Sequence, residues 1–224
     1  TDAAGVTQMQ FSSDGANWSE PETYTATKSW TLQTGDEAKT IYVRFKDSVG
    51  NWSNPYTVTI NLDTTAPVTT ASPAGGTYGS AQNVTLSANE QATIYHTTDG
   101  SNPTETSTAY IAPIPVSATT ILKYFAKDLA GNIEAVKTQT YTIDKTGPSG
   151  IIAISGGLTR TNNPALTLTL NATDAEGVTE MQFSKDGVNW SVPENYATAR
   201  AWTLVGGDGL KTVYVKFKDG VGNW

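Results

Sequence analysis

Residues 1–11 read TDAAGVTQMQF, and residues 173–183 read TDAEGVTEMQF. The match continues without a gap, so that residues 1–52 align with residues 173–224, and about two thirds of the paired positions carry the same residue. Self-similarity of this kind is the sequence signature of tandem structural modules. The first and last parts of the chain are therefore predicted to share one fold.

Two short motifs divide the chain further. The motif Asp-x-x-Gly-Asn occurs at residues 47–51, 128–132 and 219–223. A second motif, which begins with Asp and ends with Pro, occurs at residues 63–67 and 144–148. The second motif follows the first at the same spacing in both places. This punctuation predicts three modules, which are residues 1–62, 63–143 and 144–224.

The alignment also predicts that both outer modules are incomplete within this sequence. Residues 144–172 precede the repeated part of the third module, whereas no equivalent segment precedes Thr1. Likewise, no equivalent of Tyr56–Leu62 follows Trp224. An open core and an unpaired strand edge favour the addition of another strand. We therefore expect neighbouring Ig-like modules, or other copies of this chain, to complete both ends.

Alternation of apolar and polar residues dominates the three modules. It is strongest at residues 40–46, 121–125 and 166–170, and such alternation is typical of half-buried strands. Asp-Gly pairs at residues 14–15, 99–100 and 186–187 predict hairpin turns. No window has helical periodicity. The predicted fold class is all-β, with tandem Ig-like β-sandwich modules of several strands each.

Composition narrows the classes of function. The 224 residues carry a net charge of −7, whereas a nucleic-acid-binding protein needs a basic surface. There is no cysteine, which excludes disulfides, thiolate metal sites and cysteine nucleophiles. No apolar run is long enough for a transmembrane helix. These observations predict a protein that binds no nucleic acid and has no membrane span in this segment.

The central module resembles a known family. Residues 92–104 read ATIYHTTDGSNPT, and residues 117–123 and 127–132 read SATTILK and KDLAGN. Together they resemble the chitobiase/β-hexosaminidase C-terminal-type Ig-like domain, over most of residues 63–143. The outer modules, with an Asp-Gly turn before a Trp and an Asp-x-x-Gly-Asn ending, resemble bacterial Ig-like and fibronectin-III-like modules. These resemblances imply a secreted or cell-surface bacterial protein whose modules are stalks, spacers or adhesion units, and they imply no catalysis.

The Asp-x-x-Gly-Asn motif has two interpretations. In the first, it is a tight turn in which Gly50 takes a positive φ and Asp47 accepts backbone N–H groups. In the second, the aspartates bind Ca²⁺, which requires hard carboxylate and carbonyl oxygens, although no segment matches an EF-hand loop. Such an ion would stiffen the predicted module joints. The candidate ligands are Asp47, Asp63, Asp128 and Asp144, with Asp2 and Asp174 in acidic turns close to them in sequence.

Three aromatic or imidazole positions are further candidates. Trp18 and Trp190 each follow the Asn of a Gly-x-Asn-Trp-Ser segment, where they either stack on sugar rings or fold back over the open end of the sandwich. Trp30 and its equivalent Trp202 are expected in the core. The only histidine, His96, is expected to be a half-buried strand residue without a catalytic partner.

These observations predict a non-enzymatic structural and interaction segment of a large extracellular bacterial repeat protein. It would act as a stalk, an adhesin shaft or a filament subunit, without an obligatory cofactor. The alternative is a carbohydrate-binding accessory module of a secreted glycosidase, with polysaccharide as its partner.

Overall fold

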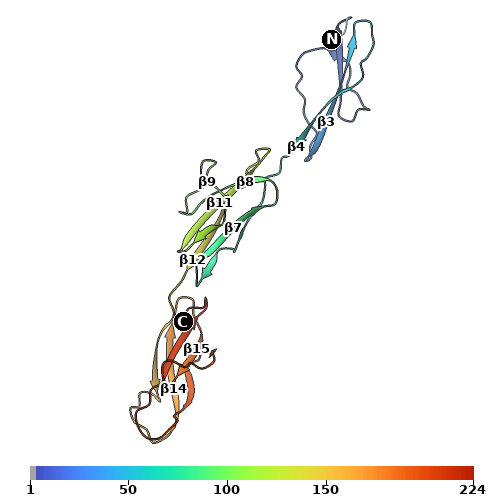
Figure 1. Cartoon of the computed structure of the whole chain (residues 1–224). Helices are drawn as coiled ribbons and strands as arrows, with labels where there is room; N and C mark the ends of the chain where they lie inside the picture. Colours follow the sequence, from blue (N-terminus) through green and yellow to red (C-terminus); the bar gives the residue numbers. More distant parts are fainter. Residues whose placement is uncertain (1–3) are drawn as a thin grey trace. The chain divides into compact units, whose positions relative to one another are not determined.

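The computed structural model describes residues 4–224 (Figure 1). Its described residues form eighteen β-strands and no helix. The predicted all-β class is therefore confirmed. Each predicted alternating segment lies within a strand or overlaps one, because period-two alternation gives a strand one apolar and one polar face.

Residues 4–62 form a single antiparallel sheet in the order β2-β1-β3-β4. Its strands are β1 (Val6–Ser12), β2 (Glu22–Thr23), β3 (Glu37–Asp47) and β4 (Tyr56–Leu62). Met9 lies opposite Phe45, and Phe11 lies opposite Val43. Residues directly opposite each other share a face, so one face of this sheet is apolar.

The strands that follow form two sheets, in the orders β10-β7-β5 and β6-β12-β11-β8-β9. Their strands are β5 (Thr69–Ser72), β6 (Gly76–Tyr78), β7 (Gln82–Ala88), β8 (Ala92–Thr97), β9 (Thr108–Ala109), β10 (Ile114–Val116), β11 (Thr120–Asp128) and β12 (Lys137–Ile143). Val84, Val116, Leu122 and Tyr124 are almost fully buried. Tyr141 is buried with them, and its hydroxyl donates to the Pro73 carbonyl at 2.7 Å. Burial raises the pKa of Tyr141 to about 12.

The last strands also form two sheets, in the orders β13-β14-β17 and β16-β15-β18. Their strands are β13 (Ser149–Ile154), β14 (Ala165–Thr173), β15 (Val178–Ser184), β16 (Glu194–Asn195), β17 (Ala199–Thr203) and β18 (Tyr214–Asp219). The core between them contains Leu168, Leu170 and Ala172 from one sheet and Met181, Phe183 and Phe217 from the other. The strict alternation of β14 thus places every second residue in the core.

The repeat seen in the sequence is also a repeat in space. The pairing of β15 with β18 has the same register as that of β1 with β3, and both carry an irregularity near the start. Met181 lies opposite Phe217 as Met9 lies opposite Phe45. Because identical residues occupy identical registers, the two sheets present the same apolar surface.

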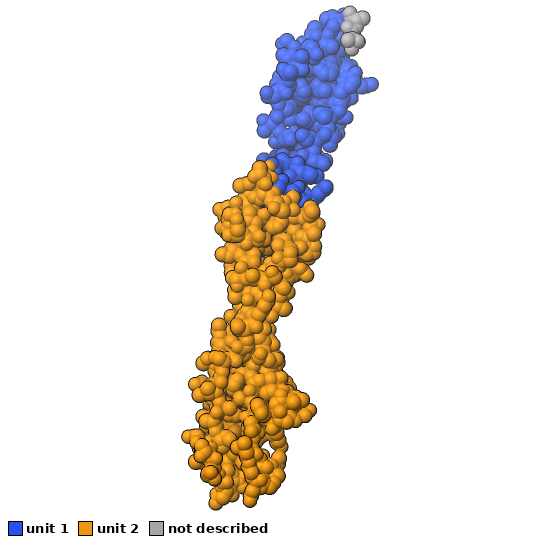
Figure 2. Space-filling view, turned by 60° about the vertical axis from the view of Figure 1, so that its left-hand side comes forward, with its two compact units in different colours: residues 1–70, 87–95, 125–136 blue, residues 71–86, 96–124, 137–224 orange. Residues whose placement is uncertain are grey.

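By proximity of its Cα atoms, the chain forms two compact units (Figure 2). One contains the residues up to 70 with 87–95 and 125–136, and the other contains residues 71–86, 96–124 and 137–224. In the described part of the chain, each sheet draws its strands from residues 6–62, 69–143 or 149–219 alone. The module boundaries near Asp63 and Asp144 stay a prediction.

Two local expectations need correction. Asp14 and Gly15 lie in the long loop between β1 and β2, not in a two-residue hairpin turn, because the Asp14 carboxylate accepts the N–H groups of Ala16 and Asn17 and builds a turn of its own. Trp30 is not a core residue, since 38% of it is exposed. No described strand of residues 4–62 covers the face against which it packs.

Candidate site at the Asp-x-x-Gly-Asn turns

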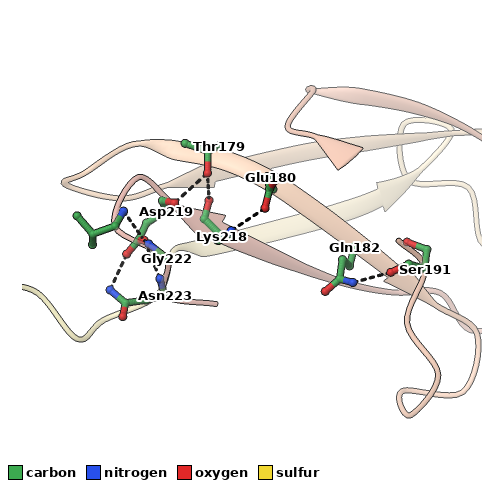
Figure 3. A network of polar contacts seen from close by, with 9 residues as sticks. Thr179, Glu180, Gln182, Ser191, Lys218, Asp219, Gly222 and Asn223 are labelled. Carbon is green, nitrogen blue, oxygen red and sulfur yellow. Dashed lines mark hydrogen bonds and ion pairs between the residues drawn. The ribbon is translucent and has the colours of Figure 1, made fainter. Parts of the chain in front are cut away.

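The last Asp-x-x-Gly-Asn turn is built around one buried carboxylate (Figure 3). Asp219 Oδ1 accepts the backbone N–H groups of Val221, Gly222 and Asn223 at 2.9, 2.6 and 2.8 Å. Its Oδ2 accepts the Asn223 side-chain amide at 2.7 Å. Gly222 has a φ of 102°, a conformation that favours glycine. The structure therefore assigns this aspartate the turn-capping role.

The same contacts recur at Asp47 and Asp128. The Asp47 carboxylate accepts the backbone and side-chain N–H groups of Asn51 at 2.8 and 2.9 Å, and Asp128 accepts those of Asn132 at 2.8 Å each. At Asp47 these hydrogen bonds lower the pKa. At Asp128 burial acts to raise the pKa, but the hydrogen bonds outweigh burial and the pKa is lowered. The turn aspartates therefore stay ionised at neutral pH.

In two of the three turns, the Asn side chain also reaches the segment predicted as a linker. Asn132 Nδ2 donates to the Asp63 carbonyl oxygen at 3.1 Å. Asn223 Nδ2 donates to the Asp144 carbonyl oxygen at 3.0 Å and to the Thr146 carbonyl oxygen at 3.3 Å. One amide group thus bonds both to its own turn and to the chain segment beside it.

The same places gather three carboxylates each. Oxygens of Asp63, Glu90 and Asp128 lie within 4.8 Å of one another, and so do oxygens of Asp144, Asp174 and Asp219. We call these groups the first and second acidic triads. In each triad, the three residues come from the segment after a strand-ending turn, from the loop between two strands and from the Asp-x-x-Gly-Asn turn.

The structure brings together only part of the sequence-predicted set. Asp63 and Asp128 meet, and Asp144 meets Asp174, but Asp47 lies in no such group among residues 4–224. Asp2 lies outside the described residues. Sequence reasoning missed Glu90 and did not name Asp219 as a ligand.

A sequence signal for these two residues did exist. Glu90 and Asp174 occupy equivalent places, since each lies between two consecutive strands, β7 and β8 in one case and β14 and β15 in the other. Asp219 has the same motif position as Asp128.

Glu90 differs electrostatically from its neighbours. Burial and then the charges of Asp63, Asp128 and Asp36 raise its pKa. A cation between the carboxylates would remove this repulsion, and a set of carboxylate oxygens suits Ca²⁺ better than a transition metal. Binding of calcium here stays a prediction.

The two tryptophans predicted as sugar platforms lie against cationic side chains. The Arg44 guanidinium carbon lies 4.4 Å from the Trp18 ring centroid and 4.9 Å from that of Trp52. Lys216 Nζ lies 4.7 Å from the Trp190 ring centroid. Both tryptophans are half-buried, and a cation–π contact accounts for one side of each ring. Sugar stacking by Trp18 and Trp190 stays a prediction.

His96 is half-buried on β8, as predicted. Its Nδ1 is buried without a hydrogen-bond partner, and its ring lies edge-on to Tyr110 at 6.4 Å. Burial lowers its pKa, so the imidazole is neutral at pH 7.

These strands and turns belong to a recognisable domain type. Residues 73–138 match the family of the chitobiase/β-hexosaminidase C-terminal domain. The predicted resemblance of the central segment is thereby confirmed. Among the described residues, no helix has the length and hydropathy needed to cross a bilayer.

Solved structures with similar folds come from two sources. The fibronectin(III)-like modules of Clostridium thermocellum CbhA are 18% identical over 70% of this chain and 88% of theirs, with a TM-score of 0.35. A tetra-tandem repeat in the extending region of a large adhesion protein is 19% identical over all of this chain and 65% of its own, with a TM-score of 0.29. A comparison with curated protein sequences found no match.

Proposed function

We propose that this chain is a non-enzymatic structural and interaction segment of a large extracellular bacterial surface or secreted repeat protein. Tandem β modules with an acidic, cysteine-free sequence support this role, as does the match of residues 73–138 to an accessory Ig-like domain. In such a protein the modules form a stalk, an adhesin shaft or a filament subunit. Its work is mechanical, because each module keeps its own core while the linkers transmit force.

One observation carries this proposal. The side-chain amides of Asn132 and Asn223 bond to the carbonyl oxygens of Asp63 and Asp144, at the start of both Pro-containing linkers. The sequences around the two linkers differ, yet the contact is the same. A linker that is bonded to a folded turn loses conformational freedom, and a following proline restricts it further. Stiff linkers are what a spacer needs.

The test measures linker mobility. We expect Asn132→Ala to raise the backbone mobility of residues 63–67, and Asn223→Ala that of residues 144–148, as measured by NMR relaxation. Asn51→Ala is the matched control, because the Asn51 amide bonds to Asp47 in the same kind of turn. Equal mobility in all three variants and in the parent chain would contradict a stiffening role.

As a second function of the same joints, we propose that the two acidic triads bind Ca²⁺. The specific observation is that the same three-carboxylate arrangement occurs twice, on different sequences and at equivalent strand ends. Ca²⁺ takes six to eight oxygen ligands, of which three carboxylates can supply about half or more. Backbone carbonyls and water would complete the shell.

Removal of the metal tests this directly. We expect CaCl₂ to raise the melting temperature above that in EDTA, and the variant Glu90→Gln with Asp174→Asn to lose that difference. Asp14 lies in a loop outside both triads, so Asp14→Asn should keep it. Identical melting curves with CaCl₂ and EDTA would leave only the turn-capping role for the aspartates.

The alternative function is carbohydrate binding by an accessory module of a secreted glycosidase. The family matched by residues 73–138 supports it, and so do Trp18 and Trp190, whose rings each have one side on a cation. A polysaccharide pull-down distinguishes the two functions. Retention by chitin or cellulose that is lost in the variant Trp18→Ala with Trp190→Ala would favour carbohydrate binding over the spacer role.

A further inference from the structure

The sheet of residues 4–62 has an apolar face that no described strand of these residues covers. The register of β3 with β4 places Val43 opposite Tyr56, and Ile41 opposite Val58. Since Val43 also lies opposite Phe11, the apolar residues of β1, β3 and β4 share this face. Those of β4 are more than half exposed, at 61% for Tyr56, 63% for Val58 and 55% for Ile60.

The opposite face of the same sheet is polar and closed. Gln10, Arg44 and Thr57 alternate with the apolar residues. Arg44 donates to Gln10 Oε1 at 2.9 and 3.0 Å and lies against the ring of Trp18. The exposed apolar residues are therefore confined to one side, which is the pattern of a sheet that packs on a second sheet.

The same surface is covered elsewhere in this chain. In the third module, Met181, Phe183 and Phe217 are 2%, 2% and 6% exposed beneath β14, whose Leu168 and Leu170 belong to the same core. The equivalents of these residues are Met9, Phe11 and Phe45. Of these, Met9 is buried, but Phe11 and Phe45 are only half-buried.

The aromatic residues around this surface are already placed as in the covered module. The rings of Phe11 and Trp30 are 5.5 Å apart, as are those of Phe183 and Trp202. Tyr24 packs edge-on to Phe45 at 5.9 Å, and Tyr196 packs edge-on to Phe217 at 5.8 Å. The surface is thus formed before any cover is present.

Two specific contacts of the covering segment have open counterparts. The Tyr196 hydroxyl accepts the backbone N–H of Ala172 at 3.0 Å, and its equivalent Tyr24 is 44% exposed. Strand β17 pairs with β14 along Ala199–Thr203, with Trp202 opposite Leu166. The equivalent residues 27–31 are not in a strand. A strand edge and a hydroxyl acceptor therefore stand ready for a β14-like strand.

We propose that the apolar face of residues 4–62 is an acceptor for a β segment with the sequence pattern of residues 147–173, as found at the start of an Ig-like repeat of this type. The segment packs its alternating leucines on Phe11, Phe45 and β4, and its backbone pairs with residues 27–31. This is binding by strand addition, in which backbone bonds give affinity and alternate side chains give specificity.

The test adds a synthetic peptide of residues 144–173 to the intact 224-residue chain. We expect saturable one-to-one binding by calorimetry. We also expect hydrogen exchange to slow by about tenfold or more in residues 27–31 and in β4, with little change in residues 69–219. No saturable binding, or protection spread evenly over the chain, would overturn the proposal.

Matched variants test the mode of binding. A peptide with Leu168→Asn and Leu170→Asn should bind at least about tenfold more weakly, because both leucines are core residues in the covered module. In the chain, Val58→Lys should weaken binding as strongly, whereas Thr59→Lys, on the polar face of the same strand, should not. Equal binding by the two peptides, or an unchanged affinity after Val58→Lys, would overturn it.

A second copy of the chain is the other occupant to consider. Concentration-dependent protection of β4 in the chain alone, which the peptide fails to displace, would overturn the assignment to this segment. The inference names the partner of the interaction role proposed above and rests on that role. Its failure would leave the linker measurements on Asn132 and Asn223 unaffected, so the two results can be told apart.

Discussion

At the scale of single residues, the acidic side chains of this protein fall into two environments. The turn aspartates accept several N–H groups each, which stabilises their charged form. Glu90 is in the opposite situation, because burial and the charges of Asp63 and Asp128 raise its pKa. One carboxylate of the first acidic triad is therefore held near others at a cost to the folded state.

This difference predicts a stabilising substitution. The pKa of Glu90 is raised from 4.5 in the folded chain, so its charge opposes folding above pH 4.5, and this penalty is complete above the folded pKa. In EDTA, we expect Glu90→Gln to raise the melting temperature at pH 7, with the gain vanishing at pH 4. Thermal unfolding followed by circular dichroism measures it.

The control for this prediction is Glu20→Gln. Glu20 is exposed, so its substitution should leave the melting temperature within error at both pH values. A lower melting temperature for Glu90→Gln at pH 7 in EDTA would contradict the assigned environment of Glu90.

At the scale of elements, partners decide where strands begin and end. The equivalent strands β3 and β18 have nearly the same sequence, yet β3 covers Glu37–Asp47 and β18 only Tyr214–Asp219. The extra length of β3 is the part that pairs with β4. Among the described residues, no strand occupies that edge of β18. A strand without a neighbour leaves its backbone groups to water and is not assigned.

Burial predicts a large difference between two aliphatic residues. Leu168 in β14 is fully buried, so Leu168→Ala should lower the free energy of unfolding of its module by about 2–5 kcal/mol. Val58 in β4 is 63% exposed, so Val58→Ala should change stability by less than about 0.5 kcal/mol. Urea unfolding of both variants measures the two effects. Similar losses would mean that β4 is covered in solution.

At the scale of the whole molecule, stability is distributed unevenly along the chain. The two sheets of residues 149–219 enclose a core of six buried side chains, whereas residues 4–62 form one sheet. In tandem modules, each unit depends mainly on its own core and on its immediate neighbours. The part with the open apolar face is therefore the weakest.

Hydrogen exchange should report this order directly. We expect backbone amides of β1 to β4 to exchange faster than those of β7, β11 and β14, because opening a half-covered sheet exposes little additional apolar surface. Mass spectrometry of the intact chain in D₂O measures it. Protection of β4 equal to that of β14 would contradict the open face.

Local features of this protein were predictable from its sequence. Strands such as β14 follow from period-two alternation, which acts over neighbouring residues only. The turn at Asp219 follows from its motif, because all its donors lie within four residues of the carboxylate. The resemblance of the central segment to an accessory domain followed from contiguous residues, and residues 73–138 match that family.

Only the tertiary structure decided which distant residues meet. Glu90 joins Asp63 and Asp128 because three separate loops end at the same place, and no local pattern encodes that meeting. Trp30 is exposed although its equivalent Trp202 packs on a core, since burial depends on a second sheet and not on the tryptophan or its neighbours in sequence. Side-chain periodicity thus sets the face on which a residue lies, whereas packing between sheets sets whether that face is buried.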